Sequence, residues 1–202
     1  MKAQLIVQAA GTPYPFTQSQ YNRMSSQRTH ADVRDGFRLW RSARHQADAL
    51  TRQHGGTVLV GAMDDRAMVM RFIGPKQHVR VGDTVTFMAT SMGEPHTVTF
   101  GSDVTGCGTP PCNPVMPWNV SLDASGNETA NYPGLNGGFT GSPTDLNTGL
   151  MFGLPPAVTH LPSTLTVTFT HAGSYPYMCA LHDYMGMMGK VVVHQGDEDS
   201  AS

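Results

Sequence analysis

The chain has 202 residues, of which 14% are charged and 39% hydrophobic, and its formal net charge is −2. This length suits one sizeable domain with an extension, or two small domains. The near-neutral charge argues against nucleic acid as a partner, and no apolar run reaches the length of a membrane-spanning helix. The 22 glycines and 14 prolines favour an all-β chain rich in turns over a helical bundle.

The first eleven residues, MKAQLIVQAAG, begin like a signal peptide. Their apolar run is too short and Gln8 interrupts it, so we expect that a signal was removed or that the chain begins partway along a gene. MKAQLIVQ also resembles MMGKVVVH, which begins at Met187. This similarity is either chance or marks the last strand of an earlier copy of this domain, with residues 9–56 as the connector. We expect residues 3–8 to pair as a strand, at the edge of this sandwich or on a neighbouring molecule, and the second case would give a homo-oligomer.

Residues 1–56 read as an N-terminal extension that is partly helical. Thr17 followed by Gln20 is a capping-box pattern. We expect one or two amphipathic helices, broken near Thr29-His30 and ended by Gly55-Gly56. Seven arginines fall between Arg23 and Arg52, so this region is either a helix packed on the main domain with a solvated arginine face or a partner-docking surface. The apolar positions at helical spacing are Val33, Phe37, Trp40, Ala47 and Leu50.

From Thr57 the apolar pattern changes to a period of two, which is typical of strands. Short apolar segments separated by turn residues predict a β-sandwich or barrel; they are TVLVGA, AMVMRFI, HVRV, TVTFMAT, HTVTFG, TLTVTFT, SYPYMC and KVVV. Residues 102–161 form a long insertion with few strand signals, which we expect to wrap the domain and to be held by Trp118 and a disulfide. A structureless loop of that length would be unusual. Residues 196–202 are an acidic tail expected to be disordered.

The chain has three cysteines, two of which are close together in CGTPPC. Cys107 and Cys112 suit a disulfide that closes a proline-stiffened loop, worth about 2 kcal/mol by loop entropy. Such a bond would place the protein in an oxidising compartment. Two free thiols or half of a zinc site are the alternatives. Either way Cys179 is left for other chemistry.

Cys179, His182 and Met187 follow one another with the spacing C-x2-H-x4-M, on a loop between two strands. A remote histidine, His96, begins another apolar strand. Each residue alone has an ordinary interpretation, because buried cysteines and methionines commonly fill cores. Together, two imidazoles, a thiolate and a weak thioether are the ligand set of a mononuclear blue copper site. Zinc sites seldom use methionine.

These segments resemble the cupredoxin family, and most closely its plastocyanin-like branch. The matching residues are Tyr175, Tyr177, Cys179, His182, Met187, Gly189, Val191 and Val193, preceded by Pro95, His96, Val98 and Phe100. The resemblance implies a Greek-key β-sandwich over residues 57–195 that holds one type 1 copper ion through His96, Cys179, His182 and Met187. It also implies supporting roles for two neighbours: the carbonyl of Pro95 approaches the copper, and the backbone or hydroxyl of Thr97 braces the ligand loop. Met185 and Met188 are the fallback axial ligands.

Copper enzymes of this kind need further metal centres. The neighbours of Cys179 are Met178 and Ala180, no His-x-His pair occurs in the sequence, and a complete ligand set leaves no open position for substrate. We therefore expect an electron carrier rather than an enzyme, working outside the cytoplasm with redox protein partners. The alternatives are a copper carrier or store, or an enzyme acting on a small nitrogen oxide. Leu181, Tyr184, Met185 and Gly186 are expected to form an apolar docking patch around the outer edge of His182.

Overall fold

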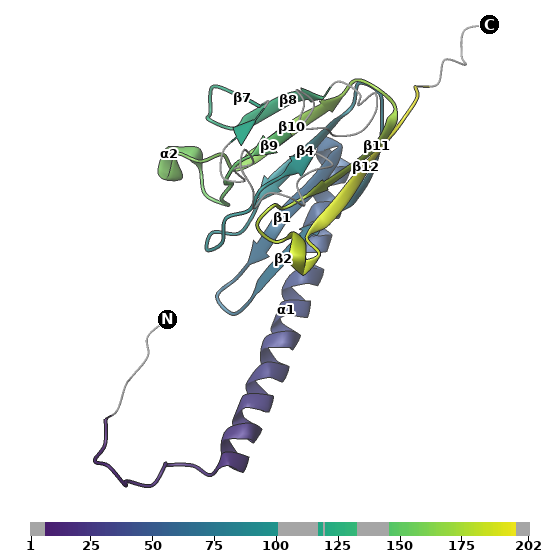
Figure 1. Ribbon diagram of the computed structural model, residues 1–202. Coiled ribbons are helices and arrows are strands. Elements are labelled where there is room, and N and C mark those ends of the chain that lie inside the picture. Colours follow the sequence, from purple (N-terminus) through teal and green to yellow (C-terminus); the bar gives the residue numbers. More distant parts are fainter. Residues whose placement is uncertain (1–6, 101–116, 119, 133–145, 197–202) are drawn as a thin grey trace, which may run out of the picture.

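Two facing β-sheets and one long helix make up the computed structural model of the chain, which describes residues 7–100, 117–118, 120–132 and 146–196 (Figure 1). The two sheets confirm the predicted β-sandwich. Over the described ranges each sheet has six strands, and both sheets mix parallel with antiparallel pairs. Among the described residues no helix is long and apolar enough to cross a membrane.

The first sheet has the strand order β2-β1-β4-β10-β8-β7. β1 pairs parallel with β4 and antiparallel with β2, and β10 pairs antiparallel with β4 and parallel with β8. The pairing of β1 with β2 shifts register between Val60 and Ala62, which marks a bulge at Gly61. The strands are β1 (Gly56–Met63), β2 (Met68–Ile73), β4 (Thr84–Ala89), β7 (Ser121–Leu122), β8 (Glu128–Tyr132) and β10 (Thr164–Phe169).

The second sheet has the order β3-β12-β11-β5-β9-β6. β11 and β12 form its central antiparallel hairpin, and β3 runs parallel to β12 at the edge. The short β5 joins the other side of β11 through Tyr177 and Met178. The strands are β3 (Lys76–Arg80), β5 (Thr99–Phe100), β6 (Pro117–Trp118), β9 (Leu146–Thr148), β11 (Gly173–Met178) and β12 (Met188–His194).

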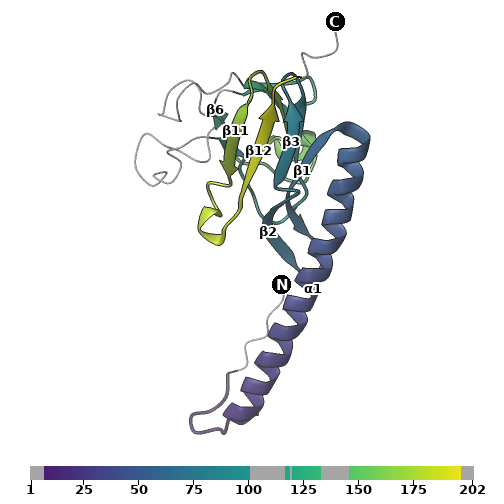
Figure 2. The same cartoon turned by 90° about the vertical axis from the view of Figure 1, so that its right-hand side faces the viewer.

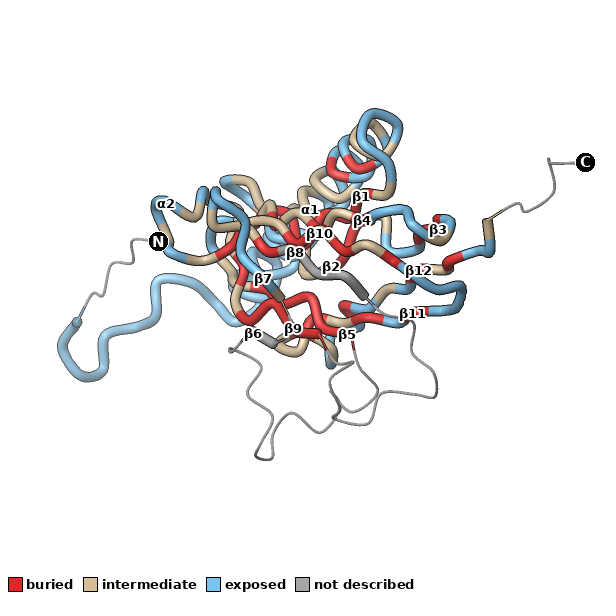
Figure 3. Tube along the Cα trace, turned by 90° about the horizontal axis from the view of Figure 1, so that it is seen from above, coloured by how far each residue is buried: buried red, intermediate tan, exposed pale blue. Residues whose placement is uncertain are grey.

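Apolar side chains from both sheets fill the space between them. β4 and β10 alternate buried and more exposed residues, as expected of strands with one face on the core. Phe87 and Tyr177 meet edge to face with ring centroids 4.9 Å apart, which joins the two sheets at the centre. β1 is instead buried from Thr57 to Ala62 (red in Figure 3), because the helix covers its outer face.

The helix α1 (Gln18–His54) is continuous, so the predicted break near Thr29-His30 is wrong. Threonine and histidine are only mildly unfavourable in a helix, and neither proline nor glycine stands at that point to interrupt it. The predicted capping box is confirmed: Thr17 accepts from the backbone of Gln20, whose side chain accepts from the backbone of Thr17. Gly55, at φ 85°, ends the helix directly before β1.

Only the C-terminal part of α1 packs on the sandwich. Ala43 and Ala47 are buried against Leu59 and Ile73 of the first sheet. The N-terminal half runs on past the end of the sheets (Figure 2). Val33 and Phe37 of the predicted apolar stripe are therefore 53% and 61% exposed.

The predicted insertion, residues 102–161, holds more regular structure than its sequence indicated. Its described parts contribute β6, β7, β8 and β9, besides the short helix α2 (Pro156–Thr159). These strands have two to five residues, too short for a periodic pattern to be read. They form because neighbouring strands pair with them: β8 pairs with β10, β7 with β8, and β9 with β5 and β6. Cys107 and Cys112 lie outside the described residues, so their disulfide stays a prediction. The side chain of Trp118 is also outside the description.

The predictions for the two ends of the chain, an N-terminal strand and a C-terminal acidic tail, are only partly covered by the described residues. Residues 3–6 of the predicted N-terminal strand and residues 197–202 of the acidic tail lie outside the described part of the chain. Val7 and Gln8 are described and belong to no strand, and Val7 is 86% exposed. The described end of the predicted strand is therefore unpaired within this molecule.

Candidate metal centre

A short loop between β11 and β12 carries the first part of the site. The backbone closes on itself there: Cys179 N–H donates to the carbonyl of Met187 at 3.0 Å, and Met187 N–H donates to the carbonyl of His182 at 3.2 Å. A single 3-10 turn, Asp183–Met185, fills the loop, and Gly186 at φ 77° ends it in the left-handed region. These bonds fix the spacing of Cys179, His182 and Met187 by local structure alone.

His96 comes from a different part of the chain, just before β5. Its backbone forms a two-bond bridge with Met151: His96 N–H donates at 3.2 Å and the N–H of Met151 returns a bond at 2.8 Å. β5 also pairs with β11, so the segment that holds His96 lies beside the strand that leads to Cys179. The sheet therefore brings together residues that are more than eighty positions apart in sequence.

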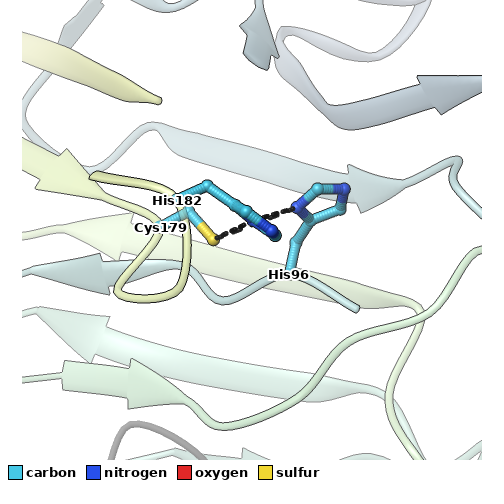
Figure 4. A group of neighbouring side chains, drawn as sticks. All are labelled: His96, Cys179 and His182. Atoms are coloured by element: carbon cyan, nitrogen blue, oxygen red, sulfur yellow. Dashed lines mark hydrogen bonds between the residues drawn. The ribbon is translucent and has the colours of Figure 1, made fainter. Parts of the chain in front are cut away.

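Three side chains converge at this point, as Figure 4 shows. Nδ1 of His96 lies 3.2 Å from Nδ1 of His182. The sulfur of Cys179 lies 3.3 Å from Nδ1 of His182 and 3.9 Å from Nδ1 of His96. His96 and Cys179 are fully buried and His182 is 5% exposed. Across the described residues, this is the cluster whose ligand atoms are close enough to share one metal ion.

The distances fit a metal ion bound at the centre of the three donors. Metal–nitrogen bonds of about 2.0–2.1 Å at a tetrahedral angle put two nitrogens roughly 3.3 Å apart, and a thiolate sulfur stands a few tenths of an ångström further out. One soft sulfur with two imidazoles is the donor set of a type 1 copper ion. The site fits one such ion.

Burial controls the protonation of these donors. It lowers the pKa of His96 to about 4, with the neighbouring His182 as a smaller cause, so the ring is neutral at physiological pH and can offer a lone pair. Burial also raises the pKa of the Cys179 thiol, while hydrogen bonds from the backbone at Thr97, Leu181 and His182 oppose the rise. A cation in the site would favour the thiolate.

Met187 is the buried methionine of the loop. It is fully buried in the same core cluster as Cys179, whereas Met185 and Met188 are 43% and 52% exposed. Its backbone bonds both Cys179 and His182. This placement favours Met187 over the two fallback residues as the thioether ligand, which stays a prediction.

Thr97 contacts the ligand loop through two groups. Its N–H donates to the sulfur of Cys179 at 3.3 Å, and its hydroxyl accepts from the N–H of Ala180 at 2.8 Å. These two bonds are compatible with the bracing role expected of Thr97, which stays a prediction. Pro95 is half-buried directly before His96, and the approach of its carbonyl to the metal stays a prediction.

Sequence reasoning missed three neighbours of the site. Glu94 Oε1 lies 3.3 Å from Nε2 of His182, so a carboxylate covers the outer nitrogen of that ring. Gly61, at φ 72°, lies against the ring of His96. Arg71 donates to the carbonyl of Gly186 at 3.3 Å and ties β2 to the ligand loop. Glu94 stands two residues before His96 and could have been suspected, but the other two contacts depend on tertiary structure.

The four predicted docking residues belong to the ligand loop between β11 and β12, and their role in docking stays a prediction. Tyr184 is 76% exposed and Met185 43%, while Leu181 is partly buried against the core. Gly186 is exposed between them and the bound Arg71. Met185 also lines a hollow between α1 and β2, together with Phe37 and Met68.

Comparisons with known proteins agree with the donor set. A family model described as copper binding proteins of the plastocyanin/azurin family matches residues 157–194, which include β10, β11, the ligand loop and β12. This match confirms the resemblance to cupredoxins over that segment. A search of the curated proteins finds no match.

Solved structures of amicyanin are also similar to this chain. The Cu(I) form of a methionine-to-alanine mutant is 24% identical, covers 69% of this chain and 81% of its own, and has a TM-score of 0.37. A reduced tryptophan-to-tyrosine mutant is 24% identical over 69% of this chain and 83% of that one, with a TM-score of 0.36.

Proposed function

We propose that this chain, whose residues 157–194 match copper-binding proteins of the plastocyanin/azurin family, carries single electrons between redox partners through one type 1 copper ion. Its ligands would be His96, Cys179, His182 and Met187. The observation that carries the proposal is the convergence of Nδ1 of both histidines and the sulfur of Cys179 within 4.8 Å of one another in a buried site.

When bound, the copper ion would supply one-electron exchange between Cu(I) and Cu(II). The polypeptide would hold the donors in one arrangement for both oxidation states. The backbone bonds that link Cys179, His182 and Met187 restrain the loop, and the bridge to Met151 restrains His96. Because little has to move when the charge changes, an electron can pass without a large rearrangement of the protein.

The electron would enter or leave beside His182. This ring is the ligand nearest the surface, since it is 5% exposed while His96 and Cys179 are fully buried. The expected docking patch of Leu181, Tyr184, Met185 and Gly186 would lie around this ring, beside the Glu94 carboxylate at its outer nitrogen. A small apolar contact suits a redox partner that must dissociate quickly.

Full burial of the donors also favours a carrier over an enzyme. With Met187 as the fourth ligand, no position would remain for a substrate. Adding nitrite or nitric oxide to the copper-loaded protein should therefore leave its visible spectrum unchanged, and a spectral shift would support an enzyme instead. A carrier or store of copper would give up Cu(I) readily to a chelator, whereas an electron carrier should retain it.

The decisive experiment is an absorption and paramagnetic-resonance spectrum of the copper-loaded chain. Cys179→Ser should abolish the intense thiolate-to-copper band, and Met187→Leu should shift the spectrum while keeping the band. Met188→Leu is the matched control, because Met188 is half exposed and lies one position further along. An unchanged chromophore in the Cys179→Ser variant would refute the proposal.

Location and assembly belong to the same proposal. An electron carrier outside the cytoplasm is expected, with an oxidised Cys107–Cys112 pair. Mass spectrometry of the purified native chain, before and after reduction, tests the disulfide. Pairing of molecules through residues 3–8 would appear as a dimer in sedimentation that is lost when these residues are removed.

A further inference from the structure

Two histidines face each other on the outer side of the second sheet, away from the candidate metal centre. His78 lies on β3 and His194 on β12, the neighbouring parallel strands that Figure 2 shows side by side. Nδ1 of His78 is 3.0 Å from Nε2 of His194, and the two rings are inclined by 14°. Both side chains are exposed, so water and ions reach them freely.

The separation of the two nitrogens suits a shared metal ion. Two nitrogens bound at about 2.0–2.1 Å stand roughly 2.9–3.4 Å apart for ligand angles between square-planar and tetrahedral. The observed distance of 3.0 Å falls within this interval. A small rotation of the exposed rings would turn both lone pairs toward one ion.

The strands hold the pair together before any ion binds. His78 pairs in register with Val192, so it is diagonal to His194, and β3 and β12 are paired over five residues. At present one ring donates a proton to the other. A metal ion would replace that shared proton, as metal binding to imidazole generally does.

We propose that His78 and His194 form a second metal site, which binds a divalent first-row transition ion through two imidazoles and water. Imidazole nitrogen suits Cu²⁺, Ni²⁺ and Zn²⁺, and Cu²⁺ is expected to bind most tightly of the three. No third His, Cys, Asp or Glu of the described residues stands within ligand-sharing distance. Asp83 and Arg80 line the same hollow with opposite charges.

This site is separate from the one at Cys179. β12 begins beside the ligand loop at Met188 and ends at His194, six residues later. At a rise of about 3.3 Å per residue this length is roughly 20 Å. The inference therefore does not rest on the electron-transfer proposal, and either can fail alone.

The test uses the full chain with its first site already loaded with copper. Titration with Cu²⁺ should add one further equivalent, seen in paramagnetic resonance as a second, type 2 signal with no change in the thiolate band. Paramagnetic broadening of ring protons by Ni²⁺ should fall first on His78 and His194. Removing a residue that only hydrogen-bonds to a metal ligand lowers metal affinity by about 10–100-fold. Removing a ligand itself, as in His78→Gln or His194→Gln, should therefore lower the affinity for the second Cu²⁺ at least about tenfold.

His45→Gln is the matched control, because it removes an exposed histidine from the face of α1. This variant should bind the second Cu²⁺ with the same affinity as the wild type. Equal binding in all three variants would overturn the inference, as would broadening that falls first on His45, His54 or His160. A wild-type chain that takes up no second equivalent would overturn it as well.

Discussion

The ring of His96 occupies the space that a side chain at position 61 would need. A Cβ built on Gly61 would overlap Nε2 of His96 and lie 2.8 Å from its Cδ2. Nε2 is buried and has no hydrogen-bond partner among the described residues. The backbone of β1 at its bulge therefore contacts the imidazole of His96 and limits how far the ring can move toward β1.

Gly61→Ala should disturb the metal centre. The added methyl group would push the ring of His96 away from Cys179 and His182, and the positive φ of 72° would cost about 1–2 kcal/mol in addition. We expect a shifted or weakened copper chromophore and a lower midpoint of thermal unfolding. Gly82→Ala is the control, because Gly82 has φ 92° and open space around its Cα. It should destabilise the fold without changing the chromophore, and a similar spectrum for both variants would contradict this explanation.

Thr97→Val should destabilise the ligand loop while leaving the donors in place. The variant keeps the N–H that donates to Cys179 but loses the hydroxyl that accepts from Ala180 N–H. The Ala180 N–H is partly buried, and the variant also loses the 3.0 Å contact between the hydroxyls of Thr97 and Thr99. Because an unsatisfied buried donor costs about 1–3 kcal/mol, the free energy of unfolding should fall by about that amount. Chemical denaturation measures it.

Thr86→Val is the comparison for this variant. Thr86 on β4 shares a hydroxyl contact of 3.3 Å with Thr166 on the neighbouring strand β10, and a valine there leaves no backbone group unpaired. The loss should be smaller than for Thr97→Val. Equal decreases in the free energy of unfolding for the two variants would mean that the hydrogen bond to Ala180 contributes no more than the contact between Thr86 and Thr166.

The ligand loop was predictable from sequence because its geometry is local. Cys179, His182 and Met187 lie within nine residues, and one turn closed by backbone bonds fixes their spacing. His96 could be added because a remote histidine at the start of an apolar strand, taken together with this loop, completes the donor set of a blue copper site. The strands with a clear period of two were also predictable, since each has one face on the core.

The remaining features depend on contacts between distant parts of the chain. Nothing near Gly61 in the sequence indicates that His96 lies against it. Strands as short as β5 and β9 exist because their neighbours pair with them. The unbroken helix differs from its prediction because weak propensities at Thr29 and His30 do not outweigh the residues on either side.

Glu94→Gln should raise the reduction potential of the copper site. The carboxylate of Glu94 lies 3.3 Å from Nε2 of His182, where its negative charge favours Cu(II) over Cu(I). The side chain of Glu94 is 34% exposed, so solvent screens much of the effect. With an effective dielectric constant between those of protein and water, we expect an increase of roughly 20–100 mV.

Cyclic voltammetry on the copper-loaded protein measures this change. Asp48→Asn removes the same charge from an exposed position of α1 and should leave the potential unchanged. A decrease in the Glu94→Gln variant, or an equal shift in both variants, would be incompatible with a direct effect of Glu94 on His182.

Burial of Glu128 should make the fold progressively less stable as the pH rises toward about 8. Its side chain is 2% exposed, Oε2 has no partner among the described residues, and burial raises its pKa from 4.5 to about 8. Between these two values the folded protein keeps a proton that the unfolded chain has lost. The free energy of unfolding should therefore fall as pH rises from about 4.5 to 8, by up to about 1.4 kcal/mol per pH unit.

Glu128→Gln removes the titrating group but keeps the shape of the side chain. The variant should gain stability relative to the wild type as pH rises, with the largest difference near pH 8 and above, where the native carboxyl must ionise in an apolar setting. Thermal unfolding of both proteins at half-unit steps from pH 5 to 9 measures the difference. Parallel stability curves across that range would show that Glu128 reaches water or a partner when it is charged, and that its burial does not govern the response to pH.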